Sequence, residues 1–473
     1  MRSKLQQIVL VALGICLGVM ISLNFPAVAQ RNASGPLPVE ELRAFTEVFG
    51  RIKSDYVEPV ADKKLITEAI TGMLAGLDPH SSYLDADALR EMQVGTRGEF
   101  GGLGIEVGME DGFVKVVSPI DDSPAARAGI KPGDLIVKLD ESSVKGMSLN
   151  DAVKRMRGKP NTQITLTIVR KGETKPLVVT LTRAVIKIQS VKSKLLEPGY
   201  AYFRVSQFQE HTGETLAKAI AATFKQNSAP MLGIVLDLRN DPGGLLNGAV
   251  AVSAAFLPQN SLVVYTDGRT EDAKMRLTAS PEHYLHGRLK DDYLANLPRE
   301  IKNVPMVVLV NSGSASASEI VAGALQDHKR AVIMGTQTFG KGSVQTILPL
   351  GNSTAIKLTT ARYYTPGGRS IQAKGIVPDI ELDEGAGRAD AASLKLREAD
   401  LTKHLANDGG SSKVAAEAAA PAANAFNFTP EPRPKDVDVK TTRPEPGEIV
   451  AKNDYELSQA IAFLKSRAAT RAD

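Results

Sequence analysis

The stretch "MLGIVLDLRNDPGGLLNGAVAVSAAFL", residues 231–257, carries the pattern that decides the fold of the largest part of this chain. Its first part, "MLGIVLDLR", is a short and almost continuously apolar run, which is typical of a strand buried inside a sheet. Its last part, "NGAVAVSAAFL", is interpreted as a helix. Strands that alternate with helices predict a sheet covered by helices.

The same alternation continues on both sides of this stretch. Taken together, these strands and helices predict an α/β domain over residues 190–385. The segments 343–350 and 355–364 resemble a pair of neighbouring strands. The expected strands are 200–208, 304–312, 330–335, 343–350 and 355–364, and the expected helices are 212–227 and 316–327.

The whole chain has 473 residues, enough for roughly three domains of ~150 residues. Hydrophobic residues make up 43% and charged residues 23%, so most of the chain can bury cores. The net charge of +4 gives no reason to expect nucleic acid as a partner. Residues 1–29 combine Arg2 and Lys4, an apolar run and a small-residue "AVAQ" site, which predicts a signal peptide and hence an exported, periplasmic protein. An uncleaved segment that associates with the membrane is the alternative.

Cysteine and histidine usage narrows the chemistry. The single cysteine, Cys16, lies in the predicted signal peptide, so the mature part has neither a disulfide nor a thiol nucleophile. The six histidines form no zinc-binding spacing. We therefore expect no metal and no cofactor.

Residues 38–95 are expected to form a helical segment, with Leu42, Phe45, Val48 and Phe49 on one side of its first helix. Within it, "LDPHSSYL" (residues 77–84) is interpreted as a helix end followed by a turn, in preference to a catalytic site.

Residues 96–186 change to short strands and turns, and this region resembles a PDZ domain. In such domains, the amides of the loop "GLGI" receive the terminal carboxylate of a peptide. The strand that follows offers a free edge, and the helix Leu149–Met156 would form the other wall of a groove. The predicted groove residues are Gly102, Leu103, Gly104, Ile105, Val153 and Met156.

Residues 386–450 are rich in alanine and proline and predict a low-complexity linker. Residues 451–473 predict a C-terminal helix capped by Asp454, with Leu457, Ile461 and Leu464 on one face. That face must pack on the core domain or on another subunit, and the sequence leaves both open.

The stretch "GTQTFGKGSVQ", residues 335–345, contains most of a phosphate-binding loop, with Lys341 as its lysine. Such a loop needs Ser or Thr directly after the lysine and a helix after that. Here Gly342 follows, and then a β-branched run that predicts a strand. A nucleotide site is therefore rejected.

Four serines, Ser312, Ser314, Ser316 and Ser318, lie where a turn leads into the helix expected at 316–327. A serine there is usually a helix cap, but on such a turn it can also be a nucleophile whose next N–H stabilises an oxyanion. A nucleophilic serine needs a base, and no histidine is suitably placed. A lysine can serve if burial keeps its amine neutral.

The motifs "LDPHSSYL", "GGLGI", "DLRNDPGG", "GSASASEI", "TFGKGSVQ" and "TTARYYTPGGRSIQ" make the chain resemble the C-terminal processing peptidases, a family of Ser/Lys serine proteases with a PDZ domain. The fold class implied is an α/β protease core preceded by a PDZ domain, with helical N- and C-terminal segments. Asp241 departs from the family pattern, in which asparagine is more usual. The resemblance implies Ser316 as nucleophile, Lys341 as base, Gln345 as the residue that orients the lysine, the N–H groups of Gly243 and Ala317 as oxyanion donors, and Asp327 as a supporting residue.

The resulting hypothesis is an exported serine endopeptidase that recognises protein C-termini and cleaves cell-envelope proteins. Its partners would be proteins with apolar C-terminal tails, and an envelope adaptor protein or a homo-oligomer is also possible. The alternative is a PDZ scaffold whose protease core is inert.

Overall fold

The computed structural model describes residues 38–120, 122–285, 292–382, 396–409, 428–433 and 448–472. The predicted signal peptide and most of the predicted linker lie outside these residues. The chain divides into two compact units, residues 1–72 and 73–473. No helix in the described ranges is both long and apolar enough to cross a bilayer.

The first unit contains helix α2 (Val39–Asp55) and most of helix α3 (Asp62–Ala75). Helix α2 buries no residue, and its apolar positions Leu42, Phe45 and Val48 are about half exposed. The helical character expected from the sequence is present, and most of the expected apolar side is exposed.

A compact β domain follows, after β1 (Ser82–Leu84) and α4 (Ala86–Arg97). Its main sheet has the strand order β3-β4-β5-β7-β8, with the short strand β6 beside β5. Strands β2 and β9 pair antiparallel where the chain enters and leaves the domain. The elements are β2 (Glu99–Gly102), β3 (Ile105–Glu110), β4 (Phe113–Pro119), α5 (Pro124–Arg127), β5 (Leu135–Leu139), β6 (Ser142–Ser143), α6 (Leu149–Met156), β7 (Gln163–Val169), β8 (Leu177–Thr182) and β9 (Ala184–Lys187).

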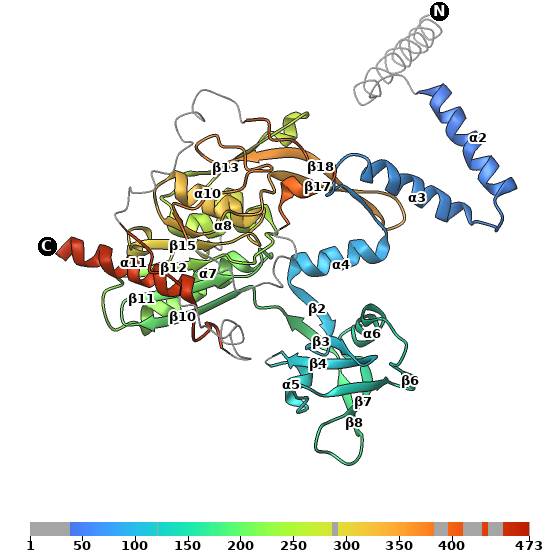
Figure 1. Ribbon diagram of the computed structural model, residues 1–473, viewed down its shortest axis with the longest axis horizontal. Coiled ribbons are helices and arrows are strands. Elements are labelled where there is room, and N and C mark those ends of the chain that lie inside the picture. Colours follow the sequence, from blue (N-terminus) through green and yellow to red (C-terminus); the bar gives the residue numbers. More distant parts are fainter. Residues whose placement is uncertain are drawn as a thin grey trace, which may run out of the picture. The chain divides into compact units, whose positions relative to one another are not determined.

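The next domain is built on a six-stranded sheet with the order β10-β11-β12-β15-β16-β19 (Figure 1). Strand β10 is antiparallel to its neighbour, and the other strands are parallel. This sheet, with helices between its strands, confirms the α/β class predicted from the alternating pattern. Its strands are β10 (Val191–Glu197), β11 (Tyr200–Val205), β12 (Gly233–Asp237), β15 (Met306–Val310), β16 (Val332–Gly335) and β19 (Ile380–Glu381).

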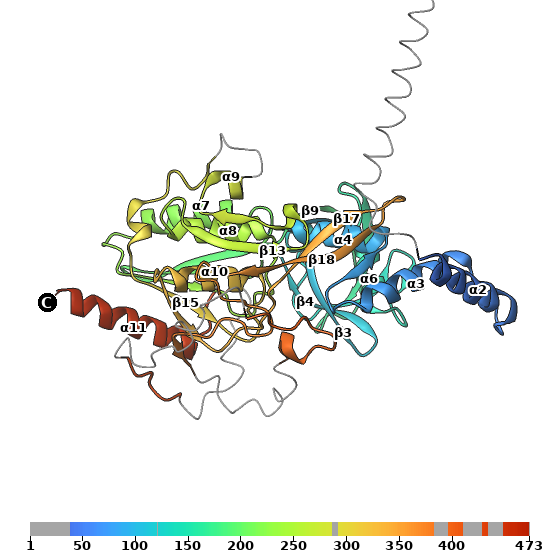
Figure 2. The ribbon, with the colours of Figure 1, turned by 90° about the horizontal axis from the view of Figure 1, so that it is seen from above.

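Helices cover both faces of this sheet (Figure 2). Alternate strand residues face opposite sides, so Phe203 and Leu236 pack in one core and Tyr202 and Val235 in the other. The first core contains α7 (Thr212–Gln226), α8 (Leu246–Phe256) and α10 (Ala317–Asp327). The second contains the C-terminal helix α11 (Tyr455–Ala472), whose apolar face therefore packs on the core domain of its own chain.

One arginine ties α11 to the end of β12. The Arg239 guanidinium donates to Asp237 Oδ2 and to Asp454 Oδ2, both at 2.7 Å, and it also contacts Glu456. Asp454 additionally accepts a hydrogen bond from Leu457 N at 3.0 Å, which makes it the expected helix cap. The same aspartate thus starts α11 and holds the segment after β12.

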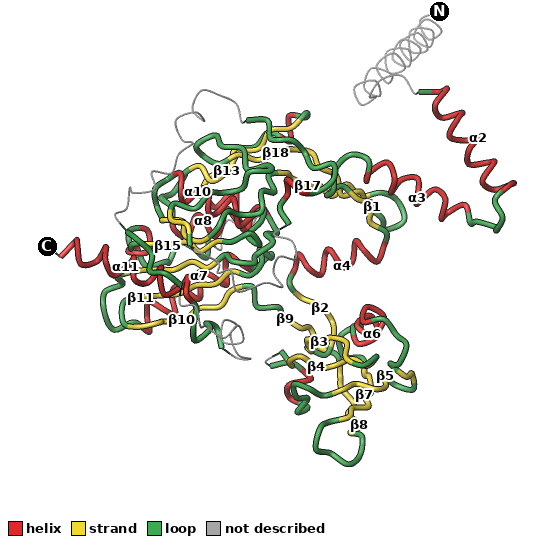
Figure 3. The backbone as a smooth tube through the Cα atoms, viewed as in Figure 1, coloured by secondary structure: helices red, strands yellow, loops and turns green. Residues whose placement is uncertain are grey.

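A second sheet contains β1 and has the order β1-β18-β13-β14, with β17 paired to β18 (Figure 3). Strands β17 and β18 form an antiparallel hairpin that begins directly after the loop of Lys341. The strands are β13 (Leu262–Gly268), β14 (Arg276–Thr278), β17 (Ser343–Pro349) and β18 (Ala355–Tyr364); the short helices are η2 (Glu271–Ala273), α9 (Pro281–Tyr284), η3 (Arg299–Lys302) and η5 (Glu398–Asp400).

Candidate active site

Ser316 lies at the N-cap of α10, on the sharp turn between strand β15 and that helix. Its backbone has φ 56° and ψ −112°, a conformation that residues with a Cβ rarely adopt. Such a conformation costs on the order of 1–3 kcal/mol and persists only where the surrounding structure imposes it. A strained serine between a strand and a helix is the local geometry of a serine nucleophile.

The neighbouring serines have structural roles. Ser314 Oγ donates to Leu238 O at 2.8 Å, and Ser318 Oγ donates to Asp241 O at 2.9 Å. Both residues are fully buried, whereas Ser316 is partly exposed. Ser314 and Ser318 therefore fasten the turn to the segment after β12, and Ser316 is left as the accessible hydroxyl among these three.

Lys341 lies in the loop between β16 and β17. Its Nζ donates to Gln345 Oε1 at 2.6 Å and to Ser343 O at 3.1 Å. No carboxylate among the described residues lies within ion-pair distance of this amine. Burial is the largest influence on it and lowers the pKa of Lys341 to about 8, with a smaller contribution from the nearby Lys357. A lysine with such a pKa is neutral often enough to act as a base.

The nitrogen end of the Gln345 side-chain amide is also held by hydrogen bonds. Its Nε2 donates to Ser343 Oγ at 3.0 Å and to Thr359 Oγ1 at 3.1 Å. Since the nitrogen is bound to these two oxygens, Oε1 faces the lysine. This is the orienting position that the family resemblance assigns to Gln345.

Glu319 joins the serine turn to the lysine loop. Its Oε2 accepts from Ser316 N at 2.8 Å and from Lys341 N at 2.9 Å, and its Oε1 accepts from Thr338 Oγ1 at 2.6 Å and from Gly340 N at 2.7 Å. Burial raises the pKa of Glu319 to about 7, although its four donors favour the charged form. The position was not singled out from the sequence, although the spacing S-x-x-E is that of a capping box.

Tyr363 is a further contact between the two halves of the site. Its hydroxyl donates to Lys341 O, and it also lies beside the Ser316 side chain. Ser316 and Lys341 are thus brought to the same place by Glu319 and Tyr363. The Lys341 amine makes no hydrogen bond to Ser316 Oγ in this structure.

The predicted oxyanion residues also lie at this turn. A Cβ placed on Gly243 would lie 2.7 Å from Ala315 O, 2.8 Å from Ala317 N and 2.8 Å from Ser316 Cβ, so the two segments touch. With φ +97°, Gly243 adopts a conformation suited to glycine. The Ala317 N–H has no hydrogen-bond partner among the described residues, as an oxyanion donor requires.

The Gly243 N–H, in contrast, already has a partner. It donates to Asp241 Oδ1 at 2.8 Å, so in this structure it is not presented to a substrate carbonyl. Asp241 is fully buried, and its Oδ2 has no hydrogen-bond partner among the described residues. Burial raises the pKa of Asp241 to about 7. The unusual aspartate of the "DLRNDPGG" motif therefore acts directly on a predicted oxyanion donor.

Asp327, predicted as a supporting residue, lies at the far end of α10 from Ser316. Its carboxylate accepts from Gly367 N at 2.7 Å and from the Arg369 guanidinium. Among the described contacts, it therefore fastens the loop after β18 and has none with Lys341.

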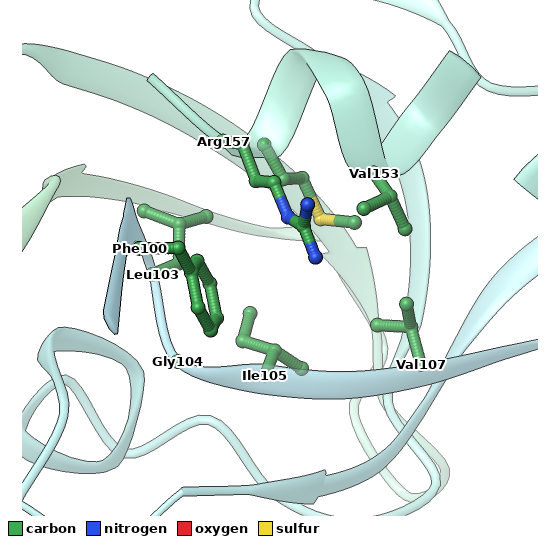
Figure 4. A pocket seen from close by; sticks show the side chains of 8 residues that line it. Phe100, Leu103, Gly104, Ile105, Val107, Val153 and Arg157 are labelled. Carbon is green, nitrogen blue, oxygen red and sulfur yellow. The ribbon is translucent and has the colours of Figure 1, made fainter. Parts of the chain in front are cut away.

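In the β domain, a pocket runs between strand β3 and helix α6 (Figure 4). Val153 and Arg157 face it from the helix side, and Ile105 and Val107 from the strand. The Arg157 guanidinium lies 4.9 Å from the centre of the Phe100 ring. Of the predicted groove residues, Leu103, Gly104, Ile105, Val153 and Met156 line this pocket, and Gly102 does not.

A model of peptidase family S41 matches residues 199–382, and a model of the PDZ domain matches residues 101–181. A model of the N-terminal domain of the activating protease CtpB matches residues 22–88. A carboxy-terminal-processing protease of Bartonella bacilliformis is 46% identical over 406 residues, which cover 85% of this chain and 89% of the relative. The chain belongs to the carboxy-terminal processing proteases of peptidase family S41.

Another carboxy-terminal processing protease, CtpA of Bacillus subtilis, is 34% identical over 401 residues, covering 84% of this chain and 80% of that protein. Among solved structures, a photosystem II D1 C-terminal processing protease is 32% identical, with a TM-score of 0.41, and the match covers 72% of this chain and 86% of that one. The family models and the two bacterial relatives show that the chain combines a PDZ domain with a serine-type peptidase domain.

Proposed function

We propose that this carboxy-terminal processing protease cuts peptide bonds with Ser316 as nucleophile and Lys341 as general base. The observation that supports this most directly is the Lys341 amine. Burial lowers its pKa to about 8, Gln345 orients it, and the Glu319 carboxylate ties its loop to the Ser316 turn. A lysine that serves only for solubility needs none of these contacts.

In the proposed reaction, the neutral Lys341 amine exchanges one of its present contacts for the Ser316 hydroxyl and takes its proton. Ser316 Oγ then attacks the peptide carbonyl carbon, and the Ala317 N–H stabilises the developing oxyanion. The Lys341 ammonium returns the proton to the leaving amine, and an acyl-enzyme remains. Water, deprotonated by Lys341, attacks the ester and restores Ser316.

The substrates are proposed to be proteins with apolar C-terminal tails, bound in the PDZ pocket. The pocket is lined mainly by apolar side chains and borders the edge of β3, which a peptide can join as an additional strand. The same proposal places the protein outside the cytoplasm, at or near the cell envelope, with envelope proteins as its substrates. This part of the proposal rests on the sequence of residues 1–29. An envelope adaptor protein or a second copy of the chain would be additional partners.

Two variants test the chemistry. Ser316→Ala and Lys341→Met are expected to abolish cleavage of an unfolded protein with an apolar tail, while Ser312→Ala, in the same turn, is expected to leave it unchanged. Circular dichroism shows whether each variant is folded. A fully active Lys341→Met variant would refute lysine as the base.

A matched pair of substrates tests terminal recognition. The same unfolded polypeptide is offered with a free and with an amidated C-terminus, and the free form is expected to be cut faster. Equal rates would refute recognition of the terminus. A purified wild-type protein that cuts neither form, nor any other apolar-tailed protein, would favour the inert scaffold.

A further inference from the structure

The loop after α3 contains a buried carboxylate that the proposed reaction does not use. Asp78 is 4% exposed. Its Oδ1 accepts from His80 N and Ser81 N, both at 2.9 Å, and its Oδ2 accepts from Ser81 Oγ at 2.7 Å. These bonds close the turn expected from "LDPHSSYL". The carboxylate also accepts one hydrogen bond from outside its own loop.

That external donor is Thr359 on strand β18, whose Oγ1 donates to Asp78 Oδ1 at 3.1 Å. The same hydroxyl accepts from Gln345 Nε2 at 3.1 Å, and Gln345 Oε1 accepts from Lys341 Nζ at 2.6 Å. A continuous chain of hydrogen bonds therefore runs from Asp78 to the Lys341 amine.

The carboxylate sets the direction of this chain. An ionised carboxylate can only accept, so Thr359 must donate its single proton to Asp78 and offer a lone pair to Gln345. Gln345 then presents its nitrogen to Thr359 and its oxygen to Lys341. If the Asp78 carboxylate were lost as an acceptor, Thr359 could donate to Gln345 instead. The Gln345 amide would then be free to turn its nitrogen toward Lys341.

A second chain leaves the same loop. His80 Nε2 contacts both oxygens of Glu398, at 2.8 and 3.0 Å, and Glu398 Oε1 accepts from Gln372 Nε2 at 2.9 Å. Gln372 Oε1 in turn accepts from Gly342 N at 3.0 Å, next to Lys341. Here, too, a buried acceptor-only carboxylate fixes which end of an amide faces the lysine loop.

We propose that the loop Asp78–Ser81 positions the catalytic lysine, with Asp78 as the residue that sets the orientation of Gln345 through Thr359. This inference rests on the proposed function of Lys341 as the base. Asp78 touches neither Ser316 nor Lys341 in the described contacts, so it acts through other residues.

Asp78 also contributes charge. The groups that act on the Lys341 amine are Lys357, which lowers its pKa, and Glu398, Glu319 and Asp78, which raise it and partly oppose burial. Removing the Asp78 charge should therefore lower the pKa of Lys341. A larger fraction of the amine would then be neutral at a given pH, and the acid limb of kcat/KM against pH should move to lower pH.

The experiment separates orientation from charge in the full-length protein. Asp78→Asn keeps an acceptor for Thr359 and removes the charge, and its control is Asp85→Asn, which makes the same change at the cap of α4. Thr359→Val breaks the chain and keeps the charge, and its control is Thr359→Ser, which restores the hydroxyl. For each variant, kcat, KM and their pH profiles are measured on one unfolded substrate, together with the free energy of unfolding.

Asp78→Asn is expected to move the acid limb to lower pH, and Asp85→Asn to leave it in place. Thr359→Val is expected to lower kcat by up to ~10²-fold with little change in KM, as for a catalytic group displaced by about 1 Å, and Thr359→Ser to recover most of that loss. If Asp78→Asn fails to fold, the Thr359 pair alone decides.

The proposal is overturned if the profile of Asp78→Asn coincides with that of Asp85→Asn, or if Thr359→Val and Thr359→Ser have equal kcat. These outcomes leave Lys341→Met inactive and the proposed function intact. An active Lys341→Met variant would instead remove the proposed function itself.

Discussion

Ser316 N and Lys341 N donate to the same oxygen, Oε2 of Glu319, at 2.8 and 2.9 Å. The proposed nucleophile and the proposed base lie on separate loops, and one buried carboxylate sets the spacing of their backbones. The position of the two functional side chains is therefore determined in part by a residue that takes no part in the proposed chemistry.

Glu319→Gln is expected to damage both the site and the fold. Three of the four donors are backbone N–H groups and each carboxylate oxygen accepts from at least one of them, so the NH2 group of a glutamine would face a backbone N–H in either orientation. The free energy of unfolding should fall by about 2 kcal/mol, the cost of unsatisfied buried groups, and kcat by ~10²-fold. Chemical denaturation and steady-state kinetics measure these. Glu271→Gln, at a carboxylate that is 89% exposed, is the control and should change neither.

Lys341→Met is expected to make the protein more stable at pH 7, while it abolishes activity. The pKa of Lys341 is lowered from 10.5 to about 8 by folding, so between these values the unfolded chain binds more protons. The stability of the wild type therefore rises with pH in this window, and below it the buried charge is destabilising. Methionine removes that cost, a gain of about 1–3 kcal/mol at pH 7 that shrinks toward pH 10. Denaturation at several pH values tests this, and a variant that is less stable at pH 7 would contradict the burial of the amine.

Asp241→Asn is expected to change how stability depends on pH. Burial raises the pKa of Asp241 from 3.8 to about 7, so between these values the folded protein binds the additional proton. The contribution of this group to stability is therefore lost as pH rises through that window. Asparagine still offers an oxygen to Gly243 N, and the variant should gain about 1–3 kcal/mol at pH 8 relative to the wild type. Identical slopes for the two proteins between pH 4 and pH 7 would argue against a buried neutral acid.

Gly243→Ala is expected to slow catalysis strongly. The new Cβ would lie within 2.8 Å of Ser316 Cβ and Ala317 N, and the backbone has φ +97°. The turn must shift, at a cost of about 2 kcal/mol or more, and kcat should fall by ~10²-fold. Gly351→Ala is the control, because no atom lies within 4 Å of its added Cβ. Kinetics and thermal unfolding of both variants check the expectation, and equal behaviour of the two would contradict it.

Val153→Asp is expected to weaken recognition of the substrate tail. Val153 lines the PDZ pocket from helix α6, and a carboxylate there is both polar and repulsive to a peptide terminus. KM for a substrate with a free apolar C-terminus should rise about 10-fold, as for a loss of ~1.4 kcal/mol in binding. Val178→Asp, on strand β8 and 69% exposed, makes the same change outside the pocket. If both variants raise KM equally, the pocket is not the recognition site.

Much of the fold was predictable because its signals are local. Apolar runs of strand length marked β12 and β15, and the change of period near Gly98 marked the β domain. The motif around Lys341 could be distinguished from a phosphate-binding loop because a strand, not a helix, follows it. Residues 451–473 were expected to form a helix, and Asp454 was expected at its start.

Contacts between distant segments could not be predicted in this way. Glu398 lies in a region assigned to a linker by composition, yet it is fully buried against His80 and Gln372. A single carboxylate among polar residues carries no local sign of a partner 318 positions away. The hydrogen bond from Gly243 N to Asp241 could not be predicted either, because it depends on backbone angles that the residue types do not specify.

The bond between Arg239 and Asp454 spans 215 positions of the chain. Arg239 lies four residues before Gly243, so the support of that loop depends on residues that the ribosome adds much later. A chain that ended before residue 448 would contain Ser316 and Lys341 but would lack the two carboxylates from the α11 region that hold Arg239.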